Sequence, residues 1–342
     1  MALKKKTRKR VVALSEKVKE YPELSLDQAL EIVVAGKRAE GVRDRTLRDY
    51  VKMFGYFREW LDENYEVSHV GELTAEMFRN YINYMKYDKP RYGGHKFITA
   101  DQGVGLSDTT ININLRALIA LFNFLEREEL IPVSPMRNIK LLRFDQNDLT
   151  NALTDDEVRR ILAVPNLKEY VSFRDYVAIN ILLDCGLRAQ ELLSLRTANI
   201  DFQTRFIHID ADKSKNRKER MVPMSTHTSK LILRLITENN EHFRTDRLFL
   251  SSYGEPLGQN HFNKRLKYYA EKAGVTAKKR TAHVYRHTWA KNMVLEGCDA
   301  FTLQKLGGWS DIRTMRRYIQ MDIKEMREKH DQFSPFVSNR YK

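Results

Sequence analysis

Cysteine is scarce in this sequence. Of its 342 residues only two are cysteines, Cys185 and Cys298, and no Cys-x-x-Cys pair or cysteine–histidine cluster has the spacing of metal ligands. These shortages exclude a disulfide framework and a zinc site as organising features of the fold. Two isolated thiols also favour a reducing compartment.

Long apolar runs and nucleotide-binding loops are missing as well. No stretch approaches the roughly 18 apolar residues of a membrane-spanning helix, and the N-terminus is polar rather than signal-like. There is no Walker-type glycine loop and no cluster of acids placed for two-metal chemistry. We expect a soluble cytoplasmic protein that has no membrane partner and needs no metal, cofactor or ATP.

Acidic residues are outnumbered by basic ones. Lysine and arginine total 59 against 45 acids, which gives a formal net charge of +14. Such a surplus points to a polyanionic partner, with nucleic acid as the default and simple solubility as the alternative. Residues 1–23 form a basic arm that either adds affinity for a DNA backbone or is a solvated tail.

Residues 283–318 concentrate groups that donate hydrogen bonds to phosphate. His283 and Arg286 are three residues apart, so on a helix they share a face and can converge on one anion. Trp309 follows a Gly-Gly pair, and Tyr318 comes nine residues later. Singly these residues read as core aromatics, a core histidine or a surface charge. Together they indicate phosphoryl-transfer chemistry on nucleic acid.

A second polar motif stands in an apolar segment. Gly186-Leu187-Arg188 is followed by Glu191, and an arginine and a glutamate in such surroundings are costly to bury unless paired or bound to an anion. The structural alternative is an ion pair that joins two helices. Farther on, residues 205–209 and 219–223 alternate in polarity around a charged turn, which predicts a β-hairpin, and residues 248–250 are expected to form a further short strand.

These motifs together resemble those of the tyrosine recombinases, the phage integrase family. Gly-Leu-Arg-x-x-Glu is similar to the family's first catalytic box, and His-x-x-Arg-His, Gly-Gly-Trp and the later tyrosine are similar to its second. Many members carry a histidine where this chain has Trp309, so the tryptophan is a departure within the family's range. The resemblance implies these catalytic residues: Arg188, Lys215, His283, Arg286, Trp309 and Tyr318, the last as nucleophile, with Glu191 and His287 in support.

The position of the lysine depends on the register of the hairpin. In the family it lies five residues ahead of the arginine of a Lys-Glu-Arg-like run, which here selects Lys215. Lys213 remains a rival, because an insertion would shift the register.

Ser25, Ser107 and Thr154 can each cap the start of a helix, and these caps together with the hairpin predict a mainly α fold with a small β component. Residues 24–135 resemble the all-helical core-binding domain that clamps DNA, and residues 136–151 read as a linker. Residues 152–320 are expected to form the α+β catalytic domain. Residues 321–342 are expected to form a helix and tail that pack on a neighbouring protomer, or alternatively on their own domain.

Polar side chains outside the catalytic boxes supply candidates for DNA contacts, with a solvated face as the equal alternative for Arg43, Arg45 and Lys52. The candidates are Arg43, Arg45, Lys52, Thr109, Thr110, Asn112, Arg116, Lys140, Arg143 and Lys213.

The resemblance implies a site-specific recombinase that acts as a homotetramer on recombination sites in double-stranded DNA, within the nucleoid, with accessory DNA-bending proteins as optional partners. Attack by Tyr318 would give a 3′-phosphotyrosyl link and a free 5′-hydroxyl, and the retained ester lets another strand reverse the step. A type IB topoisomerase-like enzyme, a telomere-resolving enzyme and a catalytically silent DNA-binding protein are the competing hypotheses. The sequence alone does not identify the target site or distinguish integration, transposition and dimer resolution.

Overall fold

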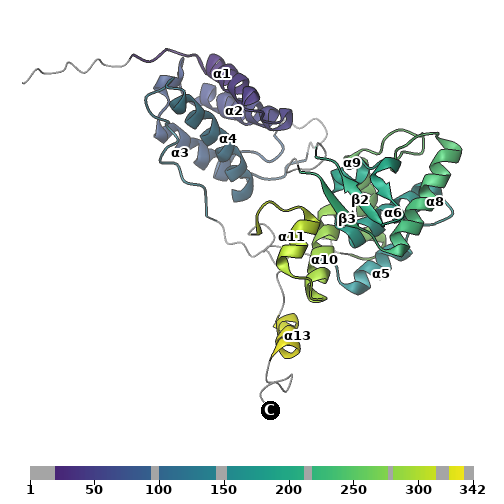
Figure 1. Ribbon diagram of the computed structural model, residues 1–342. Coiled ribbons are helices and arrows are strands. Elements are labelled where there is room, and N and C mark those ends of the chain that lie inside the picture. The colour runs from purple at the N-terminus through teal and green to yellow at the C-terminus, as the bar shows by residue number, and fades with distance from the viewer. Residues whose placement is uncertain are drawn as a thin grey trace, which may run out of the picture. The chain divides into compact units, whose positions relative to one another are not determined.

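The computed structural model describes residues 20–93, 100–143, 152–211, 218–275, 280–312 and 323–334. The chain divides into two compact units, residues 1–146 and residues 147–342 (Figure 1). The division falls inside the segment that the sequence marked as a linker. Lys213, Lys215 and Tyr318 lie outside the described residues, as do residues 1–19.

The first unit is helical. Its elements are α1 (Leu26–Ala39), α2 (Asp44–Asn64), η1 (Val70–Glu72), α3 (Ala75–Asn83), the π-helical turn η2 (Tyr84–Asp88) and α4 (Asp108–Arg127). The predicted caps are confirmed, because Ser25 and Gln28 form a capping box at α1 and the Ser107 hydroxyl accepts the Thr110 N–H at α4. Helix α4 packs against both α1 and α2. Stacked aromatic rings of Phe57 and Phe78 lie in the core.

The expectation that Asn112 faces DNA is wrong. Its side chain is buried, its amide nitrogen donates to the Leu142 carbonyl (2.9 Å) and its amide oxygen accepts the Leu142 N–H (2.8 Å). Met136 and Ile139 are buried in the same core, so ordered packing continues beyond Pro135, where we expected the domain to end. Asn112 therefore anchors the end of the first unit instead of contacting a ligand.

The second unit joins helices to a small sheet. Its elements are α5 (Asp155–Ala163), α6 (Tyr170–Cys185), α7 (Ala189–Leu193), η3 (Thr197–Asn199), β1 (Ile200–Asp201), β2 (Phe206–Ile209), β3 (Arg220–Pro223), α8 (Thr226–His242), α9 (Gln259–Lys272), α10 (Ala282–Leu295), α11 (Ala300–Gly307) and α13 (Ile323–Phe333). Within α13, Glu325 pairs with Lys291 of α10 at 2.5 Å. None of the helices in the described part of the chain is long and apolar enough to cross a membrane.

The sheet is antiparallel, in the order β1-β2-β3. The predicted hairpin is confirmed, with Ile207 opposite Val222 and Ile209 opposite Arg220. Strand β1 was not predicted, because two residues are too few to show an alternating pattern. Residues 248–250, which we expected to form a strand, instead make one isolated bridge, between Leu250 and Pro256. The fold is therefore mainly α with a small β component, as the sequence indicated.

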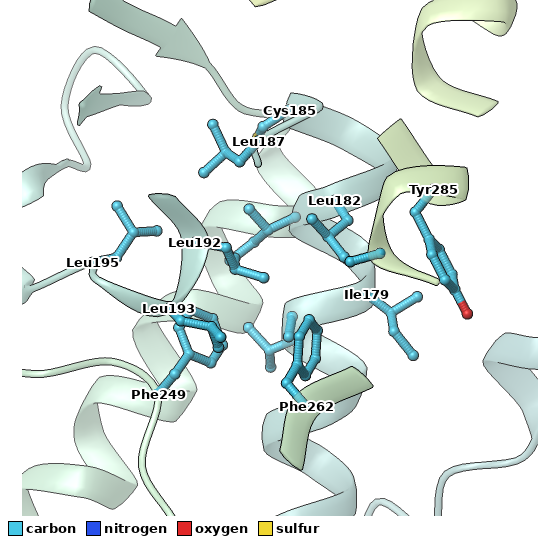
Figure 2. Packing of buried hydrophobic residues seen from close by; sticks show 14 of the residues in the cluster. Ile179, Leu182, Cys185, Leu187, Leu192, Leu193, Leu195, Phe249, Phe262 and Tyr285 are labelled. Carbon is cyan, nitrogen blue, oxygen red and sulfur yellow. The ribbon is translucent and has the colours of Figure 1, made fainter. Parts of the chain in front are cut away.

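Helix α6 runs through the centre of the second unit. Its residues 177–182 are buried without interruption, which is the pattern of a helix covered on all sides (Figure 2). It packs against α8 and α10. The helix ends at Gly186 in a left-handed conformation (φ 62°), where a β-carbon would lie 2.1 Å from the Trp289 ring. Only glycine allows this close approach, which brings the chain after α6 against α10.

Replacing Gly186 by alanine should lower the free energy of unfolding by about 1–3 kcal/mol, because the new methyl group overlaps the indole and the left-handed backbone is strained. Gly55→Ala is the matched control. Gly55 lies in the interior of α2, and a β-carbon added there would have nothing within 4 Å, so alanine should be neutral or stabilising. Thermal unfolding of both variants measures the difference. Equal stability of the two would contradict the packing described.

Candidate active site

Arg188 follows the end of α6 and immediately precedes α7. Its guanidinium Nη1 donates to Glu191 Oε1 at 2.7 Å, and its Nη2 donates to the Gly308 carbonyl, 120 residues later, at 3.1 Å. About a fifth of the side chain (21%) is exposed, whereas Glu191 is buried. Arg188 is thus held by a buried carboxylate on one side and still meets solvent on the other.

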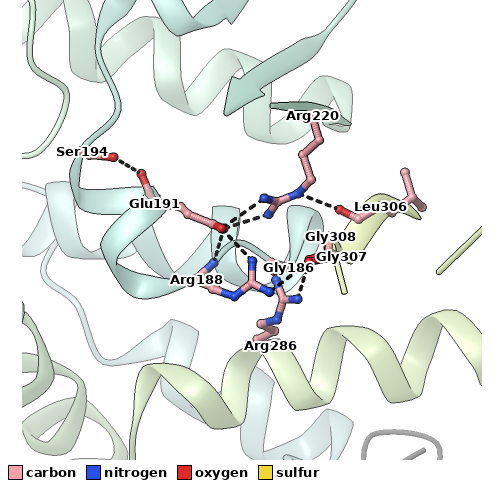
Figure 3. Close-up of polar contacts among 9 residues, drawn as sticks. All are labelled: Gly186, Arg188, Glu191, Ser194, Arg220, Arg286, Leu306, Gly307 and Gly308. Atoms are coloured by element: carbon pink, nitrogen blue, oxygen red, sulfur yellow. Dashed lines mark hydrogen bonds and ion pairs between the residues drawn. The ribbon is translucent and has the colours of Figure 1, made fainter. Parts of the chain in front are cut away.

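Glu191 is shared by two arginines. Besides the bond from Arg188, both carboxylate oxygens accept hydrogen bonds from the guanidinium of Arg220 on β3, at 3.1 and 2.8 Å (Figure 3). The Glu191 Oε2 atom also accepts the Arg188 backbone N–H at 2.9 Å. Burial raises the pKa of Glu191, but hydrogen bonding and charge from Arg220, with the charge and N–H of Arg188, outweigh burial and lower the pKa to about 2. The carboxylate is ionised at neutral pH and satisfied at both oxygens.

Arg286 lies inside the protein on α10. Its Nη1 donates to the Gly186 carbonyl at 2.5 Å and its Nη2 donates to the Gly307 carbonyl at 2.6 Å. The Trp309 ring covers the guanidinium, with 4.3 Å between Cζ and the ring centroid. The side chain is therefore fixed by two backbone carbonyls and an aromatic face.

Three arginines meet at the C-terminal end of α11. The carbonyl of Leu306 accepts Arg220 Nε at 3.1 Å, and the carbonyls of the next two residues, Gly307 and Gly308, accept Arg286 and Arg188 (Figure 3). The last carbonyls of a helix have no partner within the helix and carry its negative dipole end, so cations are favoured there. One short turn thus collects guanidiniums from α10, β3 and the start of α7.

Each of the two glycines of this turn is required for a different physical reason. A β-carbon on Gly307 would lie 1.9 Å from the Trp309 ring, which folds back over it. Gly308 ends α11 in a left-handed conformation (φ 63°), and a β-carbon there would meet Arg220 Cδ at 2.9 Å. Glycine at both positions lets the tryptophan and the arginine approach the turn.

Trp309 stacks on Trp289 of α10, with centroids 6.1 Å apart and planes 19° apart. Both rings are buried and belong to a small apolar cluster with Leu303. A tryptophan here could either donate its N–H to phosphate or pack the site shut, and this geometry supports packing. Trp289 contributes to that packing, although the sequence pattern did not single it out.

Two histidines project from α10 one turn apart. His283 is exposed and His287 is partly buried, with their rings perpendicular and 4.7 Å between centroids. Burial, together with the charges on His283 and Arg286, lowers the pKa of His287 to about 4. His287 is therefore a neutral imidazole at neutral pH.

Six catalytic or supporting residues that the sequence selected are described. Arg188 pairs with Glu191, Arg286 lies against Trp309, and His283 and His287 lie on α10 beside Arg286. Arg220 was used only to fix the hairpin register, and its place beside Glu191 was missed. The Lys-Glu-Arg run was the available signal. Lys215, its rival Lys213 and the nucleophile candidate Tyr318 lie outside the described residues.

A cleft of about 1300 Å³ lies beside this cluster, between the β2–β3 hairpin and α11. Its ionisable lining comprises the basic side chains His208, Lys218, Arg220 and Lys305 and the acids Asp210 and Glu219. Lys218 and Lys305 contribute hydrogen-bond donors to this lining, whereas Arg220 already pairs with Glu191.

Apart from Asn112, the DNA-contact candidates in the described part of the chain are exposed. They are Arg43, Arg45, Lys52, Thr109, Thr110, Arg116, Lys140 and Arg143. On α4, Thr109 and Arg116 are seven residues apart and so lie on one face of the helix. Exposure leaves these side chains accessible to a ligand and does not by itself separate a binding face from a solvated one.

A profile of the phage integrase family matches residues 151–325. Among similar curated proteins, tyrosine recombinase XerC of Chlamydia trachomatis serovar L2 is 29% identical over 238 residues, 67% of this chain and 72% of XerC. Tyrosine recombinase XerD of Pseudomonas putida is 26% identical over 289 residues, 82% of this chain and 94% of XerD.

Two solved structures share the fold at low sequence identity. The Tn1549 transposon integrase in complex with transposon right end DNA is 19% identical, with a TM-score of 0.70 over 91% of this chain and 100% of the integrase. The XerH recombinase bound to palindromic difH substrate, in a post-cleavage complex, is 21% identical, with a TM-score of 0.66 over 90% of this chain and 84% of XerH.

The lowered pKa of Glu191 predicts a pH dependence of stability. A carboxyl whose pKa folding lowers stabilises the folded state above its ordinary value of 4.5, and this contribution is lost as the pH falls toward about 2. At about 1.4 kcal/mol per pKa unit, the loss is on the order of 3 kcal/mol. Urea unfolding of the wild type and Glu191→Gln should show a difference in free energy that shrinks on acidification. A difference that stays constant from pH 7 to pH 3 would contradict the ion-pair arrangement.

Proposed function

Because the chain belongs to the phage integrase family of tyrosine recombinases, enzymes that cleave and rejoin DNA, we propose that Tyr318 is its nucleophile and that Arg188 and Arg286 bind the scissile phosphate. The observation that carries the proposal is the single turn at the end of α11, which holds both guanidiniums through consecutive carbonyls. Guanidiniums fixed in advance stabilise charge that develops during reaction without reorganising.

Cleavage of a phosphodiester by this site requires a nucleophile, neutralisation of the phosphate oxygens and an acid for the leaving oxygen. The Tyr318 oxygen forms a bond to phosphorus while the bond from phosphorus to the 5′-oxygen breaks. His283, exposed on α10, accepts the phenol proton, and Lys215 gives a proton to the 5′-oxygen. The products are a 3′-phosphotyrosyl ester and a free 5′-hydroxyl, and a second 5′-hydroxyl reverses the step on another strand.

Arginine suits the phosphate-binding role for a geometric reason. Its planar fork donates to two oxygens of a phosphate at once, whereas lysine acts as a point charge. Arg188 is the accessible member of the pair, because a fifth of its side chain is exposed while Arg286 lies beneath Trp309. In this scheme Arg188 meets the phosphate first, and Arg286 acts from the inner side of the site.

The substrate in this proposal is a pair of recombination sites in double-stranded DNA, joined by a homotetramer in the nucleoid. The structural relatives support it, since one is described in complex with transposon DNA and another on its difH substrate. The net charge of +14 and the exposed basic residues of both units favour the same ligand. Accessory DNA-bending proteins would assist assembly without entering the chemistry.

The nucleophile can be tested on duplexes first selected for binding from a randomised pool. A nick close to the scissile phosphate releases the short product strand and traps the covalent adduct. The wild type should give a protein–DNA adduct that resists denaturation, and Tyr318→Phe should give none. Tyr253→Phe is the matched control, because Tyr253 is 89% exposed in a turn. An adduct that persists in Tyr318→Phe, or none with the wild type, would refute the proposal.

Phosphate contacts by the first unit should appear in the salt dependence of binding. For duplex DNA the slope of log affinity against log salt is about −0.9 per phosphate contacted. Arg45→Gln should reduce the slope by about one contact. Arg58→Gln, on the same helix, should leave it unchanged because Arg58 already pairs with Asp62 (2.8 Å) and Asp27 (3.2 Å). Equal slopes for the wild type and Arg45→Gln would show that Arg45 makes no contact with a DNA phosphate.

A further inference from the structure

Arg220 is the third arginine of the site, and it contacts Glu191 and the turn at the end of α11, two features that help to hold Arg188 and Arg286. It is the first residue of β3 and lies opposite Ile209 in the sheet. Its side chain is 9% exposed. From there the guanidinium donates to both oxygens of Glu191 and to the carbonyl of Leu306. One side chain thus joins the hairpin to the first motif and to the end of α11.

The orientation of Arg188 depends on this arrangement. Glu191 Oε1 accepts both Arg188 Nη1 and Arg220 Nη1, so the position of the carboxylate is set by two guanidiniums together. Without Arg220, the carboxylate would lose two of its four hydrogen bonds and could rotate within its pocket. Arg188 would then keep its ion pair but lose a fixed direction toward the phosphate.

The turn that holds Arg286 depends on Arg220 as well. Arg220 Cδ, Nε and Cζ lie 2.9–3.1 Å from the position of a β-carbon on Gly308, so the side chain packs directly on the turn. Its Nε also donates a hydrogen bond to the Leu306 carbonyl. The neighbouring carbonyls are those that accept Arg286 and Arg188. Movement of the turn would displace both guanidiniums at once.

We propose that Arg220 is a positioning residue for DNA cleavage: it holds Glu191 and the Leu306–Gly308 turn so that the guanidiniums of Arg188 and Arg286 are fixed for the scissile phosphate. It does not bind the phosphate itself, because all three of its guanidinium nitrogens already donate to Glu191 and Leu306. This inference rests on the function proposed above.

Arg220→Lys is the principal test variant. Lysine keeps the positive charge beside the buried carboxylate, so the fold is retained, but it cannot hold both Glu191 oxygens and the Leu306 carbonyl in one plane. Arg220→Gln is the second variant and removes the charge. Arg265→Gln is the structural control, because Arg265 also pairs with a buried carboxylate, Asp175, at 2.7 Å, but belongs to α9 and takes no part in the cluster.

The readout is single-turnover cleavage of the selected nicked duplex with either an ordinary phosphodiester or a methylphosphonate at the scissile position. The methylphosphonate lacks the negative oxygen that the guanidiniums neutralise. Arg220→Lys and Arg188→Lys should each lose roughly 10²-fold in rate on the phosphodiester, and both losses should shrink on the methylphosphonate. Arg265→Gln should lower the unfolding temperature, and any loss of rate should be the same on both substrates.

The double variant Arg188→Lys/Arg220→Lys provides an independent test of whether Arg220 acts through Arg188, and this test needs only the phosphodiester substrate. If Arg220 acts through Arg188 and its partners, the double variant should be slower than Arg188→Lys by well under the roughly 10²-fold loss of Arg220→Lys alone. Losses that multiply, together with an Arg220→Lys defect of equal size on both substrates, would overturn the inference. Failure of the proposed function looks different, because the wild type would then form no adduct on the phosphodiester.

Discussion

The C-terminal end of one short helix, α11, is the constraint on which the site depends. Its last carbonyls have no partner within the helix, and three guanidiniums supply the missing hydrogen bonds. The arginines come from positions 188, 220 and 286, far apart in the chain. A helix terminus thus fixes their relative positions before any ligand arrives. The negative end of the helix dipole favours the same arrangement.

Charge inside the cluster is balanced so that it can be buried and still attract an anion. Glu191 is ionised and bonded at both oxygens, so it offsets the cost of burying Arg188 and Arg220 beside it. One carboxylate between two guanidiniums leaves this trio with a net positive charge, and the trio lies against the turn that holds Arg286. The stacked rings of Trp309 and Trp289 close the inner side and shelter the guanidinium from water.

Local chemistry explains what the sequence could predict. Ser25, Ser107 and Thr154 begin helices because their side chains accept the N–H groups of the first turn, three residues later, and these signals need no tertiary contact. The pairing of Arg188 with Glu191 follows from their spacing of three residues in the same way. The family's motifs added the link between the two boxes, which spacing alone does not supply.

The features that the sequence missed or misassigned share a different cause. Arg220 contacts residues 29 and 86 positions away, and Asn112 contacts Leu142, 30 positions away. No periodicity within a helix or strand encodes such partners, so a polar residue that is buried by a distant segment looks like one that faces solvent. Residues 248–250 have the composition of a strand but lack a neighbouring strand to pair with among the described residues, and pairing is decided by the fold.

The central claim is that the arginine cluster at the end of α11 is already in its working arrangement. A crystal structure of the covalent protein–DNA adduct tests this claim most directly. Arg188 and Arg286 should both lie within hydrogen-bonding distance of the phosphotyrosyl oxygens, while Arg220 keeps its bonds to Glu191 and the Leu306 carbonyl. An adduct in which Arg220 has left Glu191 to bind the phosphate, or in which the cluster lies away from it, would contradict the account.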